Sequence, residues 1–221
     1  MFKRQIRLST VLKQNALLIL LLLTGYAVHA MESYDRLYEM ILANCALSSE
    51  PFNADLFNML VDNELLGGFN INQANKNEYI LLHYAAIGGN ESIVKKLLSA
   101  HADVNKINYE GNTPLHFAAR NGNTEVLTLL LTAGAKVNIK NNEDETPLHK
   151  AAGYDHINAM RKLLAVGAHQ CIKNKEGKTV LEVALTTSSK LLLKKHLACW
   201  LRMVLPQLPL DIRKVVAHHV C

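Results

Sequence analysis

A period of 33 residues is the feature that most constrains the fold of this chain. The tetrapeptide TPLH occurs at 113–116 and returns 33 residues later at 146–149. The same register contains ILLH at 80–83 and TVLE at 179–182, so four copies follow one another without an insertion. A period of this length predicts a solenoid, in which each unit buries its apolar side against its neighbours.

The rest of each unit keeps the same register. Apolar segments with helical spacing occur at 93–105, 126–138 and 157–171, and asparagine recurs at 75, 108, 141 and 174, in the turn before each unit. Each unit therefore reads as a short turn followed by two helices. The chain resembles the ankyrin-repeat family, and one repeat carries the most matches: Gly111, Thr113, Pro114, Leu115, His116, Ala118, Ala119, Gly122, Gly134, Ala135, Val137 and Asn138.

The resemblance implies an all-α repeat solenoid of helix-turn-helix units, joined by β-hairpin-like turns and closed by helical caps at both ends. We expect Trp200 to cover the exposed core at the C-terminal end, because tryptophan can close an apolar face while its N–H finds a partner at the edge. The expected organisation is a signal peptide at 1–30, an N-terminal cap or degenerate repeat at 31–75, repeats at 76–108, 109–141 and 142–174, a capping repeat at 175–204 and an amphipathic tail at 205–221.

The threonine and histidine of the repeated tetrapeptide are expected to be structural. Threonine can cap a helix by accepting a hydrogen bond from a first-turn N–H, and proline suits the first helical position. Histidine can donate and accept at once, and so can join the cap to the neighbouring turn. The residues assigned to this role are His83, Thr113, His116, Thr146 and His149, with Glu182 at the fourth position. Because stacking would space the histidines by one repeat, we expect no metal site among them.

The N-terminus has the order of a secretory signal peptide. Four basic residues among the first 13 precede an apolar run at 16–28, and Val28 and Ala30 are small residues at the positions before a cleavage site. The apolar run is shorter than the roughly 20 residues that span a bilayer. We expect cleavage after Ala30 and export by the secretory pathway, with no membrane attachment afterwards. The alternative is a protein anchored in the membrane by an uncleaved 16–28 segment.

Removal of residues 1–30 changes the charge balance. The net charge of +5 includes four basic residues and no acidic one from this segment, which leaves 20 basic and 19 acidic residues. The balance therefore gives no reason to expect nucleic acid binding. Residues 31–170 hold 11 basic and 16 acidic residues, whereas residues 171–221 hold 9 and 3. We expect an acidic array with a basic end.

The sequence contains none of the motifs that would indicate an enzyme. It has no nucleophile elbow, phosphate-binding glycine loop or HExxH motif. The four cysteines show no CxxC spacing, so a zinc site is not expected, and a repeat array large enough to fold without disulfides favours free thiols. We therefore expect a non-enzymatic chain without catalytic residues, metal or cofactor.

The positions flanking the TPLH motif are candidates for contact with a protein partner. In the ankyrin-like arrangement, the hairpin tips and one side of the inner helices form a concave groove. We assign to partner binding Tyr79, Tyr109, Glu110, Asn112, Arg120, Asn121, Glu143, Glu145, Tyr154, Lys175 and Lys178. The tyrosines and Arg120 are the strongest candidates, because aromatic and arginine side chains dominate interface energetics. The partner's identity stays open, and we expect the chain itself to be a monomer.

The tail at 205–221 leaves two interpretations open. Its LPLDIRKVV stretch resembles the start of F-box-like segments, which would make the protein an adaptor that recruits a second machine such as a ubiquitin-ligase component. The other interpretation is a short amphipathic helix that folds back over the last repeat.

Overall fold

The computed structural model describes residues 70–204 and Gln207. The predicted signal peptide at 1–30, the apolar run at 16–28, most of the N-terminal cap and the rest of the tail at 205–221 lie outside the described residues.

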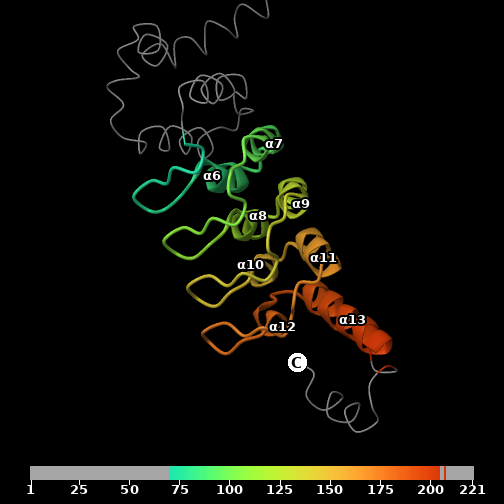
Figure 1. The fold of residues 1–221 in the computed structure, drawn as a ribbon. Coiled ribbons are helices and arrows are strands. Elements are labelled where there is room, and N and C mark those ends of the chain that lie inside the picture. The colour runs from blue at the N-terminus through green and yellow to red at the C-terminus, as the bar shows by residue number, and fades with distance from the viewer. Residues whose placement is uncertain (1–69, 205–206, 208–221) are drawn as a thin grey trace, which may run out of the picture. The chain divides into compact units, whose positions relative to one another are not determined.

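The described helices form two stacked rows (Figure 1). One row consists of the inner helices, in which α6 contacts α8, α8 contacts α10 and α10 contacts α12, while the outer helices α7, α9, α11 and α13 contact one another in the same order. The bounds are α6 Leu81–Gly88, α7 Glu91–Ser99, α8 Pro114–Asn121, α9 Thr124–Thr132, α10 Pro147–Gly153, α11 Ile157–Ala165, α12 Val180–Val183 and α13 Thr187–Val204. The predicted all-α solenoid is confirmed.

Hairpin-like turns project beside the inner row (Figure 1) and are bonded from one repeat to the next. The N–H groups of Tyr109, Asn142 and Lys175 each donate to the carbonyl 32 positions earlier, at 3.1, 2.9 and 3.0 Å. Residues 70–204 contain no β-strand, so successive turns are joined by one backbone–backbone hydrogen bond at each step and not by a sheet. Each turn is therefore held in place by its neighbours.

The core lies between the two rows and follows the period. Leu82, Leu115 and Leu148 occupy equivalent inner positions and are fully buried. Alanine pairs such as Ala118 and Ala119 are also fully buried, and their small side chains let the inner and outer helices of a repeat approach closely. Burial of these periodic apolar positions is the main stabilising term, at about 25 cal/mol per Å² of apolar surface.

The turn between the inner and outer helices requires a left-handed residue. Gly122 has φ +70°, and a Cβ at this position would come within 2.4 Å of His156 Nδ1. The equivalent residue one repeat later is Asp155, which has φ +59°. Its carboxylate accepts hydrogen bonds from the hydroxyls of Thr186, at 2.7 Å, and Ser189. A small partner at Ser189 therefore lets a non-glycine residue occupy this turn and ties it to the capping repeat.

The capping repeat departs from the predicted helix at 179–185. Helix α12 ends at Val183, and Ala184 has the extended angles φ −57° and ψ 127°. Leu185 stands at the position of the fully buried Ala152, yet it is 67 % exposed. A leucine side chain is too large for a position where two helices approach at an alanine. The chain therefore leaves the helix and turns this side chain to solvent.

The prediction that Trp200 covers the end of the core stays a prediction, because the side chain is only partly exposed. Helix α13 has 18 residues, whereas α11 has nine. Trp200 follows the buried Leu193 by seven residues and so lies on the same face of the helix. In the repeat register it falls beyond the end of α11, which explains why it stays 45 % exposed.

The expectation of free thiols fails at one described cysteine. Cys171 is disulfide-bonded, and its partner lies outside the described residues. Cys199 is free and exposed. At the positions equivalent to Cys171, the amides of Asn105 and Asn138 each donate to the loop of the next repeat at 3.3 Å. The repeat after Cys171 has no such loop, because α13 continues through the equivalent position, Trp200.

Candidate functional site

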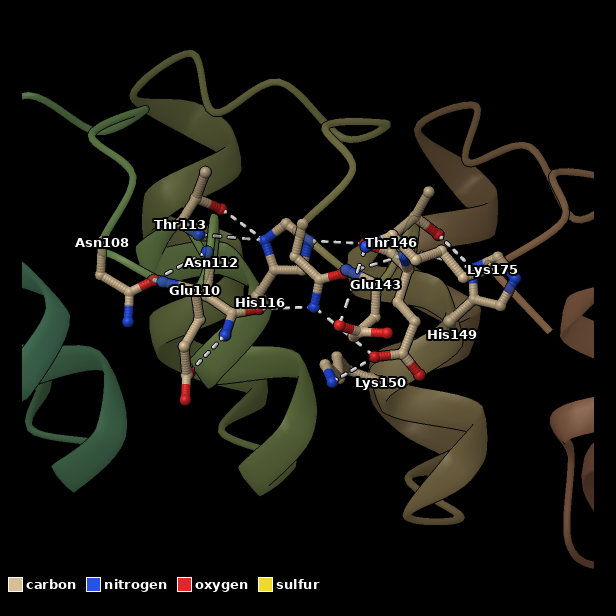
Figure 2. Close-up of polar contacts among 12 residues, drawn as sticks. Asn108, Glu110, Asn112, Thr113, His116, Glu143, Thr146, His149, Lys150 and Lys175 are labelled. Atoms are coloured by element: carbon tan, nitrogen blue, oxygen red, sulfur yellow. Dashed lines mark hydrogen bonds and ion pairs between the residues drawn. The ribbon is translucent and has the colours of Figure 1, made fainter.

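The histidines join each helix start to the next repeat. Nδ1 of His116 accepts hydrogen bonds from the Thr113 N–H at 3.1 Å and from its hydroxyl at 2.9 Å, while Nε2 lies 3.0 Å from the Glu145 carbonyl. His83 makes the equivalent contacts, from the Ile80 N–H at 3.0 Å and to the Asn112 carbonyl at 3.2 Å. Figure 2 shows this chain of contacts around Thr113 and His116.

These partners determine the tautomer of His116. A backbone N–H can only donate, so Nδ1 carries the lone pair, and the carbonyl of Glu145 can only accept, so Nε2 carries the proton. The Thr113 hydroxyl therefore donates to Nδ1. The Thr113 hydroxyl thus bonds to the imidazole in addition to its part in the capping box at the start of α8.

His83, His116 and His149 form a histidine ladder, and its end explains why a glutamate stands at the equivalent position 182. His149 accepts from the Thr146 N–H at 3.2 Å, but its buried Nε2 meets no acceptor with good hydrogen-bond geometry. Glu182 takes the accepting role alone, since one carboxylate oxygen accepts from the Thr179 N–H at 2.7 Å and from its hydroxyl at 2.9 Å. Among the described residues no further repeat follows, so the donor that histidine supplies has no acceptor to meet there.

Burial controls the protonation of the ladder. Desolvation, partly offset by the hydrogen bond to the Asn112 carbonyl, lowers the pKa of His83 to about 4. Desolvation also lowers the pKa of His116 to about 4, and that of His149 falls for the same reason. The imidazoles are therefore neutral at pH 7. Among the described residues, no group of three or more His, Cys, Asp or Glu side chains could hold a metal ion.

We define the hairpin surface as the turns at 76–79, 109–112, 142–145 and 175–178 with the exposed ends of the inner helices. At its first end the ring of Tyr79 contacts four aromatic rings: Tyr84 at 5.2 Å, His83 at 5.4 Å, Phe117 at 5.6 Å and Tyr109 at 6.3 Å between centroids. Burial raises the pKa of Tyr79 to about 12. Tyr79 is thus partly committed to the core, whereas Tyr109 is 55 % exposed.

A second aromatic position lies further along the hairpin surface. Tyr154 ends α10 and is 50 % exposed. The guanidinium of Arg120, from the preceding repeat, lies 5.1 Å from the centre of its ring. Asn121 is also exposed, but its amide donates to the Ile87 carbonyl at 2.9 Å. The structure therefore brings Arg120 and Tyr154 together at the surface and gives Asn121 a bond between repeats.

Asn112 does not lie on the exposed surface, as partner binding would require. Its Oδ1 accepts from Asn141 at 2.9 Å, its Nδ2 donates to Glu110 at 2.9 Å, and its carbonyl accepts from His83. The residue is buried. Contacts from the repeats on both sides surround it, so it acts as a joint between hairpins.

The charged candidates differ in how far they are already engaged. Glu145 forms a half-buried ion pair with Lys150, and its carbonyl accepts from His116. Glu143 is exposed and lies 4.0 Å from the Lys175 ammonium, which is exposed as well. Lys178 pairs with Glu176 at 2.7 Å in the last hairpin. Surface pairs of this kind contribute at most about 1 kcal/mol, so a partner can replace them at little cost.

Sequence reasoning missed three residues that support the hairpin surface from within the array. Phe117 and Lys150 stand at the variable position within TPLHxAA, where their side chains meet Tyr79 and Glu145 respectively. Asn108 is buried, and its Oδ1 accepts from the N–H groups of Glu110 and Asn112 at 3.1 and 2.8 Å. The recurrence of asparagine at 75, 108, 141 and 174 was the available signal in the sequence. Only the structure shows that this asparagine shapes the hairpin.

The comparisons with known families agree with this geometry. A model of three ankyrin repeats matches residues 42–141, and a second model of ankyrin repeats in many copies matches residues 130–184. The chain belongs to the ankyrin-repeat family. No curated protein matches it.

Membership of the family indicates a general class of activity. Ankyrin repeats generally mediate protein–protein interaction, and proteins built from them are typically scaffolds and not enzymes. Within residues 70–204 no helix has the length and apolarity to cross a membrane.

Proposed function

We propose that this protein is a non-enzymatic scaffold that binds a protein partner through its hairpin surface. The observation that carries the proposal is the exposure of two aromatic rings, Tyr109 and Tyr154, on adjacent repeats of this surface. Exposed aromatic side chains bury a large area at small entropic cost, and interface hot spots are enriched in tyrosine and arginine. Arg120, stacked on Tyr154, adds a charged contact at the second ring.

The separation of buried joining residues from exposed residues within each repeat supports this assignment. Residues that join the repeats, such as His116, Asn112 and Asn141, are buried and use their polar atoms inside the array. Tyr109, Glu143 and Tyr154 are exposed beside them on the same hairpins and inner helices. A partner can therefore contact the exposed set without breaking the bonds between repeats.

Export through the secretory pathway is the second element of the proposal. Its basis is the order of basic, apolar and small residues in 1–30. The disulfide at Cys171 agrees with it, because disulfides persist in oxidising compartments and are rare in the cytosol. An N-terminal anchor at 16–28 remains the alternative location. The adaptor alternative depends on the sequence of the tail at 205–221 alone.

The proposed scaffold function is tested by capturing the partner and then measuring its affinity for the purified protein. Tyr109→Ala and Tyr154→Ala should each weaken the affinity for the captured partner by roughly 1 to 4 kcal/mol, the range of interface anchors. Lys162→Ala, on the exposed side of α11, is the matched control and should leave the affinity unchanged. If the control weakens binding as much as the tyrosine variants do, or if both tyrosine variants bind like the wild type, the hairpin surface is not the binding site.

A further inference from the structure

Glu110 presents a fixed negative charge next to an exposed aromatic ring. The Tyr109 hydroxyl donates to Oε1 at 3.0 Å, and the Asn112 amide donates to Oε2 at 2.9 Å. Both donors are neutral. Within the described part of the chain no lysine or arginine forms an ion pair with Glu110. Its charge is held in position but not neutralised.

The carboxylates of the next hairpin differ in this respect. Asp144 pairs with Lys140 at 3.0 Å, Glu145 pairs with Lys150, and Glu143 lies 4.0 Å from Lys175. Each of these three therefore has a cation of the chain nearby. Glu110 instead has the aromatic side chain of Tyr109 beside it.

The backbone around Glu110 is fixed by the neighbouring repeats. The Tyr109 N–H donates to the Asn77 carbonyl at 3.1 Å, and the carbonyls of Tyr109 and Glu110 accept from Asn142, each at 2.9 Å. The Glu110 N–H donates to Asn108 at 3.1 Å. A ligand that binds here has little to order, and the entropic cost of binding is reduced accordingly.

The chemistry of the position selects an arginine side chain. A carboxylate oxygen accepts two hydrogen bonds, so each oxygen of Glu110 keeps one free acceptor direction. A guanidinium can donate to both oxygens at once and can stack on an aromatic ring, which the compact lysine ammonium cannot do equally well. The exposed ring of Tyr109 lies directly beside the carboxylate.

Charge along the surface agrees with a basic partner. The four turns of the hairpin surface together contain six carboxylates and three lysines, and all but one of the carboxylates lie in the first three turns, with one of the lysines. We infer that the partner of the proposed function docks a basic segment on these hairpins, with one arginine paired to Glu110 and stacked on Tyr109. This inference rests on the proposed function and specifies the chemistry of its partner.

Fluorescence anisotropy with defined peptides tests the inference directly. The probe is a fluorescein-labelled peptide in which arginine alternates with Gly-Ser pairs, and its counterparts carry lysine or glutamate in place of arginine. The protein should bind the arginine peptide, bind the lysine peptide more weakly and not bind the glutamate peptide. Glu110→Gln should lower the affinity for the arginine peptide by about tenfold, equivalent to about 1.4 kcal/mol. Tyr109→Ala should lower this affinity to a similar degree.

Glu125→Gln is the matched control. Glu125 lies on the outer helix α9 and, like Glu110, accepts a hydrogen bond from a neutral neighbour, the Thr124 hydroxyl at 2.8 Å. Its removal should leave peptide affinity unchanged. Tyr109→Phe keeps the ring and removes the donor to Glu110, so it should give a smaller loss than Tyr109→Ala. Melting temperatures of all variants establish that each one is folded.

Three results would overturn the inference. They are no binding of the arginine peptide, equal losses in Glu110→Gln and Glu125→Gln, and wild-type affinity in a folded Glu110→Gln variant. These results do not decide the proposed function, which is tested separately with the captured partner. If the captured partner loses affinity with Tyr109→Ala but not with Glu110→Gln, the hairpin surface remains the binding site and its partner does not use an arginine at Glu110.

Discussion

Nε2 of His116 lies 3.0 Å from the carbonyl oxygen of Glu145 and bonds one repeat to the hairpin of the next. The other ring nitrogen holds the start of its own helix through Thr113. A single buried side chain therefore couples local helix geometry to the stacking of repeats. Its chemistry is complete within the array and leaves no atom of the ring for catalysis.

The first prediction concerns this joint. His116→Ala removes partners from the Thr113 N–H and the Glu145 carbonyl, both in a buried environment, and each unsatisfied group costs about 1 to 3 kcal/mol. The free energy of unfolding, measured with urea, should fall by about 2 to 5 kcal/mol. His169→Ala removes an exposed histidine and should change it by less than about 0.5 kcal/mol. Equal effects of the two changes would show that the joint contributes nothing.

The second prediction is acid destabilisation that begins near neutrality. His83 and His116 keep a pKa of about 4 in the fold against 6.5 when unfolded, so the unfolded state binds protons first as pH falls. Stability should be constant above pH 6.5 and should decline between pH 6.5 and about 4. The difference in pKa corresponds to about 3 kcal/mol for each histidine. Urea unfolding over this range measures the loss.

Carboxylates act at lower pH and can be separated from the histidines. The hydrogen bonds from Thr179 lower the pKa of Glu182 below its usual 4.5, and those from Ser189 and Thr186 lower the pKa of Asp155 below 3.8. Their contribution is therefore present above these values and is lost at lower pH. A free energy of unfolding that stays flat from pH 7 down to about 5 would contradict the histidine assignment.

The third prediction exchanges leucine and alanine between equivalent positions. Leu185→Ala places in the capping repeat the residue that Ala152 supplies in the repeat before it, and removes an exposed apolar side chain. Helix α12 should extend beyond Val183, visible as slower hydrogen exchange of the amides at 184–186, with stability unchanged or slightly increased. The reverse change, Ala152→Leu, should lower the free energy of unfolding by about 1 to 3 kcal/mol through overpacking. A tolerated Ala152→Leu would mean that helix approach does not explain the early end of α12.

The fourth prediction concerns the N-terminus. Because Val28 and Ala30 precede the expected cleavage site, the mature protein should begin at Met31. Intact mass and N-terminal sequencing of protein recovered from its native source measure this. A membrane-bound protein that retains residues 1–30 would replace the exported form with the anchored one.

The sequence by itself determined the unit of this fold. The 33-residue register, the threonine and proline at helix starts and the histidine at one phase are local or strictly periodic features. Periodic apolar positions have a single way to be buried when identical units stack, so the two rows of helices could be predicted without coordinates. The exposed candidates Tyr109, Tyr154 and Arg120 followed from the same register, because they flank the conserved phase of each unit.

The tertiary structure decided what depends on neighbours that differ from repeat to repeat. Asn112 is buried because Asn141 and His83 approach it from the two adjacent repeats. Among the described residues Glu110 forms no ion pair, because Asn142 stands at the position from which Lys175 reaches Glu143 one repeat later. Leu185 is turned outward by the close approach of two helices, and Trp200 is exposed because α11 ends before reaching it. Each outcome is set by contacts between residues about 30 positions apart or by the length of a neighbouring helix, and a repeat register records the spacing of such residues but not whether their side chains meet.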